Sequence, residues 1–406
     1  MRGRVGAVLG YWRAERRTIR QGFVALVVAS LGNLIAGLTL GSITGTLERL
    51  PGLMVLVPAA IGMRGNIFGA LGSRLGTSVH TGLFEATRRR EGVLYQNVAA
   101  ASVLTLAISL GLGVLAKALS VAFGITSISL ADFVVISILG GVLSSVVVAL
   151  FAVALAVRAF RRGWDLDSVA APLVTAVGDV VTLPALFLAS FAVGVPGVTP
   201  AVGTAALVAM AWAAVWGLRT DLPVTRRVVR HGLVLLLVAG GIDVFAGLVM
   251  EARLDRLAAF PVLLVLIPPF LADAGALGSI LSSRLASKLH LGALTPRGRP
   301  EPAALLDTTI IFLFSVWLFA LVGFSADVVA TLFGLASPGP LRVLGISLLG
   351  GLIATAFAVV VAYYAATATF RMGLDPDDFG IPIITSTMDF LGVISLFMAL
   401  AAFGVA

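Results

Sequence analysis

The stretch DLDSVAAPLVTAVGDVVT at residues 165–182 recurs as DPDDFGIPIITSTMDFLG at residues 375–392. Both copies begin with an Asp-x-Asp turn, continue through a proline, and then place one carboxylate, Asp179 or Asp389, inside an apolar run. An ionisable group within a membrane-length apolar segment is costly and usually marks a functional site. Two such groups at equivalent positions predict a paired site rather than a chance charge.

The composition surrounding these two stretches indicates a membrane protein. Of 406 residues, 59% are hydrophobic and 12% charged, with a mean hydropathy of +1.08. Repeated apolar runs of about 20 residues are typical of polytopic helical membrane proteins. The net charge of +8 comes from arginines in short loops and does not indicate nucleic-acid binding. Cysteine is absent, which excludes disulfides, thiolate metal sites and a cysteine nucleophile.

The apolar runs predict an all-α fold with about eleven transmembrane helices. We expect spans at residues 22–46, 52–74, 97–123, 133–158, 169–194, 200–218, 228–250, 260–283, 303–325, 341–370 and 379–404. The first 21 residues are too polar for a signal peptide and are expected to form a cytoplasmic tail. Tyr11 and Trp12 could lie on the anionic membrane surface, or the tail could serve orientation alone.

An internal repeat with a constant offset of 210 residues runs through five spans. Gly22 corresponds to Gly232, Pro58 to Pro268, and the Gly-Gly pair at 140–141 to the pair at 350–351. The chain therefore reads as a duplicated unit. We assign a tail at 1–21, a first five-helix repeat at 22–197, a linker helix and loop at 198–227, and a second five-helix repeat at 228–406.

The number of spans and the charges predict how the repeats are oriented. Five spans would invert the second copy, and the extra span restores its direction, so the repeats are expected to be parallel. With the N-terminus cytoplasmic and the C-terminus outside, 22 of the 28 basic residues fall in segments on the cytoplasmic side of the membrane. The outer segments carry only Arg49, Lys117, Arg253, Arg256 and Arg342. Parallel repeats predict a pseudo-two-fold axis along the membrane normal, across which Asp179 and Asp389 would meet.

The surroundings of the two aspartates suggest a site for a hard cation. Thr175 and Thr385 each lie four residues before the aspartate and so share its helical face. The prolines at 172 and 382 can free backbone carbonyls nearby. Carboxylates, hydroxyls and carbonyls are ligands for Mg²⁺ or Ca²⁺, and Mg²⁺ keeps most of its water. Alternatively, the aspartates are protonated or hydrogen-bonded and only fix helix packing.

Other polar residues within or beside the spans form a second tier of candidates. The segment PAAIGMRGNIFGALGSRL at 58–75, repeated in weaker form at 268–285, suggests a broken helix lining a cavity, or plain small-residue packing. We list Asn33, Asn66 and Asp243 as secondary ligands, and expect an ion pair between Arg64 and Asp273. The carboxylates of the Asp-x-Asp turns could gather cations or cap helices; they are Asp165, Asp167, Asp375, Asp377 and Asp378.

These motifs together resemble the MgtE family of magnesium transporters and its duplicated relatives in solute carrier family forty-one. The matching positions are Pro58, Gly65, Asn66, Ser73, Arg74, Asp165, Asp167, Pro172, Gly178 and Asp179, with Asp375, Pro376, Asp377, Pro382 and Asp389 in the second copy. The resemblance implies that the final-span aspartates bind hydrated Mg²⁺ in a central pore. It departs at Ala276, in place of the second Asn, and at Met388, in place of Gly. The regulatory cytosolic domain of many bacterial members is not expected, and a duplicated chain could form the pore as a monomer.

The resulting hypothesis is Mg²⁺ transport by a non-enzymatic membrane protein whose other partners are lipids and not nucleic acid. An alternative is an exchanger that couples a divalent cation to Na⁺ or H⁺. A second alternative, an intramembrane aspartyl protease, is disfavoured because neither aspartate follows a Gly-x-Gly pattern. The residues His80, His231 and His290 are too dispersed for zinc, and no GxxxxGK[ST] motif supports ATP-driven transport.

Overall fold

The computed structural model describes residues 2–85, 87, 89–162, 170–194, 197–373 and 380–405. Within these ranges all regular structure is helical, and eleven helices are long and apolar enough to cross a membrane. The predicted all-α polytopic fold is confirmed. The eleven are α2 (Arg16–Ser42), α4 (Leu53–His80), α5 (Val93–Ala122), α6 (Leu130–Arg162), α7 (Ala170–Ser190), α8 (Val198–Arg219), α9 (Pro223–Glu251), α11 (Pro261–His290), α12 (Pro302–Leu332), α13 (Pro340–Met372) and α14 (Ile381–Ala402).

The first span of each repeat ends in a short additional helix. Helix α2 stops at Ser42, four residues before the predicted end, and α3 (Thr44–Arg49) follows. In the second repeat α9 is followed in the same way by α10 (Leu254–Ala259), which lies 210 residues after α3. The sequence TGTLER of α3 is too polar to extend a span, so the chain turns and buries Leu47 alone of these six residues.

The second span of each repeat is a continuous helix, so the prediction of a broken helix is wrong. Helix α4 runs through Pro58, and α11 runs through Pro268 and Pro269. Pro58 lies in the second turn of α4, where it removes one backbone donor. The residues from Leu53 to Ala60 are all buried, and this packing keeps the helix intact.

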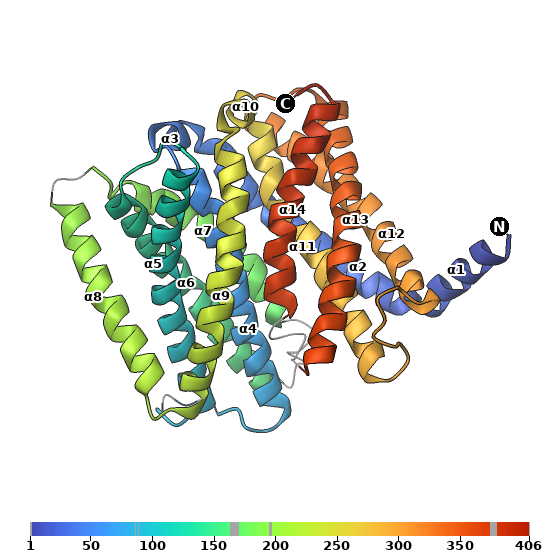
Figure 1. Cartoon of the computed structure of the whole chain (residues 1–406), viewed down its shortest axis with the longest axis horizontal. Coiled ribbons are helices and arrows are strands. Elements are labelled where there is room, and N and C mark those ends of the chain that lie inside the picture. The colour runs from blue at the N-terminus through green and yellow to red at the C-terminus, as the bar shows by residue number, and fades with distance from the viewer. Residues whose placement is uncertain are drawn as a thin grey trace. The chain divides into compact units, whose positions relative to one another are not determined.

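The contacts divide the chain into two compact units that do not follow the repeat boundaries. One unit comprises residues 1–42 and 255–406, and the other comprises residues 43–254. In the first unit α2 packs on α11 and α12, and in the second α9 packs on α4 and α5. In Figure 1 the helices α11 to α14 of the first unit are coloured from yellow-orange at α11 to red at α14. Each unit therefore joins four spans of one repeat to the first span of the other.

Glycines at equivalent positions permit this exchange of first spans. A β-carbon on Gly37 would overlap the carbonyl oxygen of Val265, and one on Gly247 would overlap the carbonyl oxygen of Val55. The Val265 carbonyl is four residues before Pro269, which has no N–H to donate to it. Backbone therefore packs directly on backbone at both positions, as small residues allow in membrane helices.

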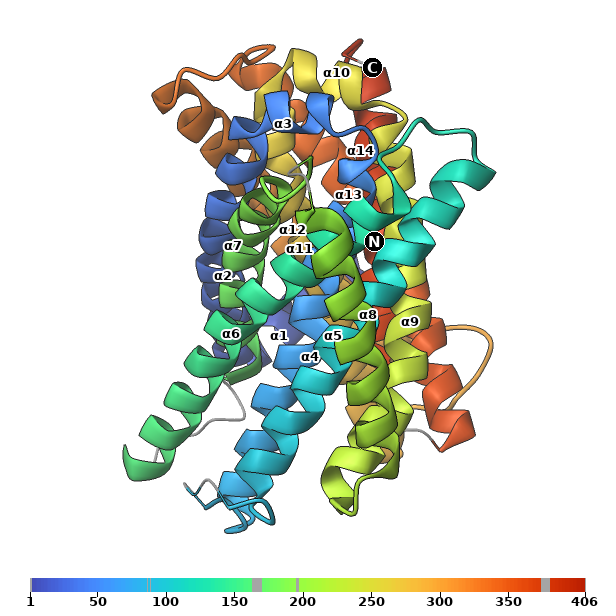
Figure 2. The same ribbon diagram turned by 90° about the vertical axis from the view of Figure 1, so that its left-hand side faces the viewer.

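The linker span α8 lies on the outside of its unit. It packs on α5, α6 and α9, and only 22% of its most apolar window is buried, the lowest share among the described spans. Figure 2 shows α8 in front of α5 and beside α9. Most of its surface is thus available to lipid.

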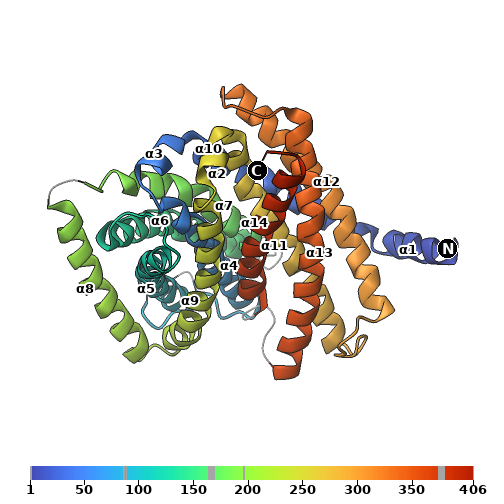
Figure 3. The same cartoon turned by 45° about the horizontal axis from the view of Figure 1, so that its top comes forward.

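The N-terminal segment forms a helix, α1 (Arg2–Ala14), that contacts α2 and α12 (Figure 3). The Tyr11 hydroxyl donates to Asp307 at 2.6 Å, and the Trp12 indole donates to Thr309 at 3.0 Å. Both side chains thus contact α12, and the expectation that they lie on the membrane surface stays a prediction. The Tyr11 hydroxyl donates to a buried carboxylate, which makes its bond the stronger of the two.

Candidate cation site

The two final-span aspartates lie on equivalent helices in different units. Asp179 on α7 is buried, with 6% of its surface exposed, and Asp389 on α14 is half-buried. The predicted meeting of Asp179 with Asp389 would join the two units, so it stays a prediction. The Asp-x-Asp turns that precede both helices, at 165–167 and 375–378, lie outside the described residues.

In the unit of residues 43–254, the face of α7 that carries the site packs on glycines of α4. A β-carbon on Gly65 would lie 3.1 Å from the Thr175 methyl, and one on Gly69 would lie 2.9 Å from the Thr175 hydroxyl. One on Gly178 would lie 3.4 Å from the β-carbon of Arg64. The small residues of the second span therefore admit the threonine that precedes Asp179.

The equivalent face of α14 is less open. Thr385 lies over Gly275, and its hydroxyl donates to the carbonyls of Ile381 and Pro382 at 3.1 Å. Ser279 occupies the position equivalent to Gly69, and Met388, which replaces the glycine before the aspartate, is buried against Gly278. The irregularity of the second copy is thus a real difference in packing at this site.

The secondary candidates are distributed between the units by the exchanged first spans. Asp243 on α9 is fully buried and shares its unit with Asp179 and with the half-buried Asn66 on α4. Asn33 on α2 is buried in the unit of Asp389, and its side-chain oxygen has no hydrogen-bond partner among the described residues. Across the described part of the chain, no three His, Asp or Glu side chains cluster closely enough to hold a metal ion.

Arg64 has partners that the sequence reasoning missed. Its guanidinium is 1% exposed and donates to the hydroxyls of Ser145 at 2.8 Å, Ser109 at 3.0 Å and Thr105 at 3.4 Å. The predicted ion pair with Asp273 would join different units and stays a prediction. Asp273 accepts hydrogen bonds of 2.7 Å from Ser30 within its own unit. Two of these hydroxyls, at 105 and 145, recur as hydroxyls 210 residues later, and this signal could have indicated a polar layer.

Comparisons with known proteins agree with this architecture. The sequence pattern of the MgtE family, described as a divalent cation transporter, matches residues 57–189 and again residues 267–399, with the same offset of 210 as the internal repeat. The two matches extend into α7 and α14, include Asp179 and Asp389, and together span more than half of the chain.

Curated relatives match along most of the chain. Solute carrier family 41 member 3 of Mus musculus is 27% identical over 397 residues, covering 91% of this chain and 79% of the relative. Member 3 of Rattus norvegicus is 24% identical over 392 residues, covering 91% and 84%. Member 2 of Xenopus laevis is 26% identical over 420 residues, covering 91% and 69%. No solved structure matches. The chain, with its twofold match and its apolar spans, belongs to the MgtE family of divalent cation transporters.

Proposed function

We propose that the transported cation is Mg²⁺ and that Asp179 and Asp389 both line its path. The observation that carries the proposal is the recurrence of one carboxylate in the final span of each family-matched stretch. Each follows a threonine that packs on a glycine of the second span, Gly65 or Gly275. The sequence symmetry supports a contribution by both aspartates to one path.

The ligand chemistry favours a hydrated ion. Mg²⁺ demands octahedral geometry and gives up water reluctantly, so it is often held by one or two carboxylates through a retained water shell. Among the described residues no three carboxylate or histidine side chains cluster, which suits a hydrated ion better than one coordinated only by protein ligands. In the proposal, the Thr175 and Thr385 hydroxyl oxygens accept hydrogen bonds from that water shell. Asn33, Asn66 and Asp243 act as second-tier groups along the path.

We further propose that the protein works in the cell membrane as a single chain, with its N-terminus cytoplasmic and its C-terminus outside. The excess of basic residues in the segments assigned to the inside supports this orientation. The duplication supports a pore formed by one chain. Membership in a family of transporters supports a non-enzymatic role.

Mg²⁺ flux into proteoliposomes tests the proposal. We would compare the wild type with Asp179→Asn, Asp389→Asn and the double variant. The matched control is Asp132→Asn, a half-buried carboxylate at the start of α6 that accepts a hydrogen bond from Ser129. The flux of each single variant should be lower than that of the wild type by about tenfold or more. The asparagine lacks the negative charge that attracts the cation and accepts charge-assisted hydrogen bonds from its water shell. Asp132→Asn should behave as wild type. Wild-type flux from a folded double variant would refute the site.

A coupled exchanger is the second candidate, favoured by relatives that are named as solute carriers. The same liposomes would carry an opposing Na⁺ or H⁺ gradient. Flux that follows the Mg²⁺ gradient alone indicates a channel-like path. Flux that stops when the second gradient is removed indicates exchange, and loss of that coupled flux in Asp179→Asn or Asp389→Asn would assign it to the same aspartates.

A further inference from the structure

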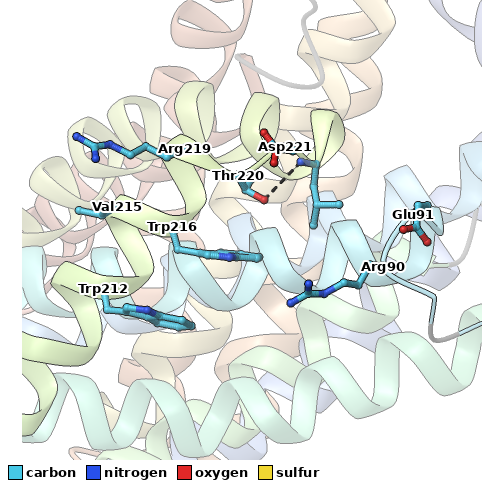
Figure 4. Close-up of a pocket in the computed structure, with 9 residues that line it drawn as sticks. Arg90, Glu91, Trp212, Val215, Trp216, Arg219, Thr220 and Asp221 are labelled. Carbon is cyan, nitrogen blue, oxygen red and sulfur yellow. Dashed lines mark hydrogen bonds between the residues drawn. The ribbon is translucent and has the colours of Figure 1, made fainter.

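A pocket of about 550 Å³ lies at the C-terminal end of the linker span α8, and its lining includes neither final-span aspartate. Its walls are the last two turns of α8, the turn at residues 220–222, and Arg90 with Glu91 before α5 (Figure 4). All of these belong to the unit of residues 43–254. The proposed transport mechanism uses none of them.

Two tryptophans form the apolar wall of the pocket. The indole rings of Trp212 and Trp216 are stacked, with centroids 6.3 Å apart and planes 16° from parallel. Trp216 is fixed against a buried cluster that includes Ala213 and Val229, whereas Trp212 is 69% exposed. Trp212 continues the exposed apolar surface of α8 that includes Val208. The pocket thus opens toward a lipid-facing helix surface, and tryptophan is the residue that proteins favour at the headgroup level.

The buried side chain of Gln96 holds the polar walls together. Its amide donates to the carbonyl of Glu91 at 2.9 Å, and its side-chain oxygen accepts from the backbone N–H of Val224 at 3.0 Å. Its own carbonyl accepts from the Thr225 hydroxyl at 2.9 Å. These bonds connect the start of α5 to the start of α9, next to the lining residues Glu91 and Leu222. The walls are therefore organised before any ligand arrives.

The charges of the pocket are of both signs. Its lining contains two arginines, Arg90 and Arg219, and two carboxylates, Glu91 and Asp221, which gives a formal charge of zero. In Figure 4 Arg90 extends toward the indole rings, whereas Arg219 extends away from them. The pocket can offer a guanidinium to a phosphate while carboxylates at its rim accept hydrogen bonds from an ammonium group.

We propose that this pocket binds the headgroup of a zwitterionic aminophospholipid, phosphatidylethanolamine. Arg90 pairs with the phosphate, Glu91 and Asp221 receive the ammonium, and the stacked indoles cover the glycerol and the first methylenes of an acyl chain. A free phosphate would leave the exposed apolar surface of Trp212 unused. A net-anionic headgroup would meet two carboxylates. A quaternary ammonium has no N–H to donate to them. The inference stands independently of the transported ion.

Native mass spectrometry of the full chain tests the assignment. The protein would be released from nanodiscs with equal amounts of phosphatidylethanolamine, phosphatidylglycerol and phosphatidylcholine, and the retained lipids counted. Wild type should retain phosphatidylethanolamine preferentially. Arg90→Gln should lower that retention by about tenfold, as expected for the loss of a charge-assisted hydrogen bond. Arg89→Gln is the matched control, since Arg89 is exposed and does not line the pocket.

Two further arms keep the test decisive if one variant folds poorly. Replacing both carboxylates, Glu91→Gln with Asp221→Asn, should move the preference from phosphatidylethanolamine toward phosphatidylglycerol. Trp212→Leu should reduce retention of all three lipids several-fold. Equal retention by wild type, Arg90→Gln and Arg89→Gln would overturn the proposal. Displacement of the lipid by millimolar inorganic phosphate or glycerophosphoethanolamine would also overturn it, because the site would then be one for a soluble phosphate compound.

Discussion

The guanidinium of Arg64 donates a hydrogen bond of 2.8 Å to the hydroxyl of Ser145, inside the bundle of α4 to α9. The positions 210 residues later hold Ala274 and Thr355, and the Thr355 hydroxyl donates to Ser315 at 2.7 Å. There the rings of Phe270 and Phe319 pack on each other, with centroids 4.9 Å apart. The same layer of the fold is thus built with a buried charge in one unit and with aromatic rings in the other.

Because the unit of residues 1–42 and 255–406 packs this layer with Ala274 in place of the arginine, we expect Arg64 to serve cation handling rather than folding. Arg64→Leu should leave a folded protein and lower the Mg²⁺ concentration at half-maximal flux several-fold, since a fixed positive charge behind Gly178 repels a dication near Asp179. Arg64→Lys, which keeps the charge, should stay close to wild type in concentration dependence. The measurement is flux over a range of Mg²⁺ concentrations, from which the half-maximal concentration of each variant is obtained. Identical curves for Arg64→Leu and wild type would show a purely structural role.

The packing of first spans on the opposite repeat depends on Gly37 and Gly247. An alanine at either position would place its β-carbon onto a backbone carbonyl, and we expect a loss of about 2–4 kcal/mol in stability. Gly32→Ala is the matched control on α2, because nothing lies within 4 Å of its β-carbon. That control should be neutral or slightly stabilising. Thermal unfolding in detergent measures the difference. Equal melting of Gly37→Ala and Gly32→Ala would contradict the packing of α2 on α11.

The contact between Gly65 and Thr175 sets how closely the final span approaches the second. Gly65→Ala would press its methyl against the Thr175 methyl, which lies 3.1 Å from the new β-carbon position. We expect flux to fall by about tenfold, the effect of a misplaced ligand of roughly 1 Å or less. Adding Thr175→Ser removes the methyl and keeps the hydroxyl, so the double variant should recover most of the flux. If the double variant does not recover flux, the loss in Gly65→Ala does not come from the contact between Gly65 and Thr175.

Asp307 is the centre of an ionic cluster at one end of α12. Its fully buried carboxylate binds Lys288 at 2.5 Å, Arg284 at 2.8 Å and the Tyr11 hydroxyl at 2.6 Å. Asp307→Asn would leave Lys288 without its counter-charge and Arg284 with Glu15 alone, and should destabilise the protein by about 3 kcal/mol. Tyr11→Phe should cost about 1 kcal/mol. Glu301→Gln, which affects a surface pair with Arg297, is the control and should leave the melting temperature unchanged. A melting temperature unaltered by Asp307→Asn would mean that the cluster is not formed in the membrane protein.

The sequence by itself determined the eleven spans, the repeat and the two in-span aspartates, Asp179 and Asp389. Hydrocarbon thickness dictates how many consecutive apolar residues a span needs, and an in-span carboxylate stands out against that background wherever the span packs. The family-specific motifs around Asp179 and Asp389 were equally visible, since a constant offset of 210 aligns them without any structure.

Only the tertiary structure decided which spans pack together. All eleven spans are apolar, so hydrophobicity does not distinguish one partner helix from another in a membrane. The choice rests on local fit: Gly37 on the Val265 carbonyl, Gly247 on the Val55 carbonyl, and Arg64 on three hydroxyls from α5 and α6. Residues separated by 41 to 228 positions meet in these contacts. Their pairing follows from shape and hydrogen bonding in the folded chain, which no local pattern of residues encodes.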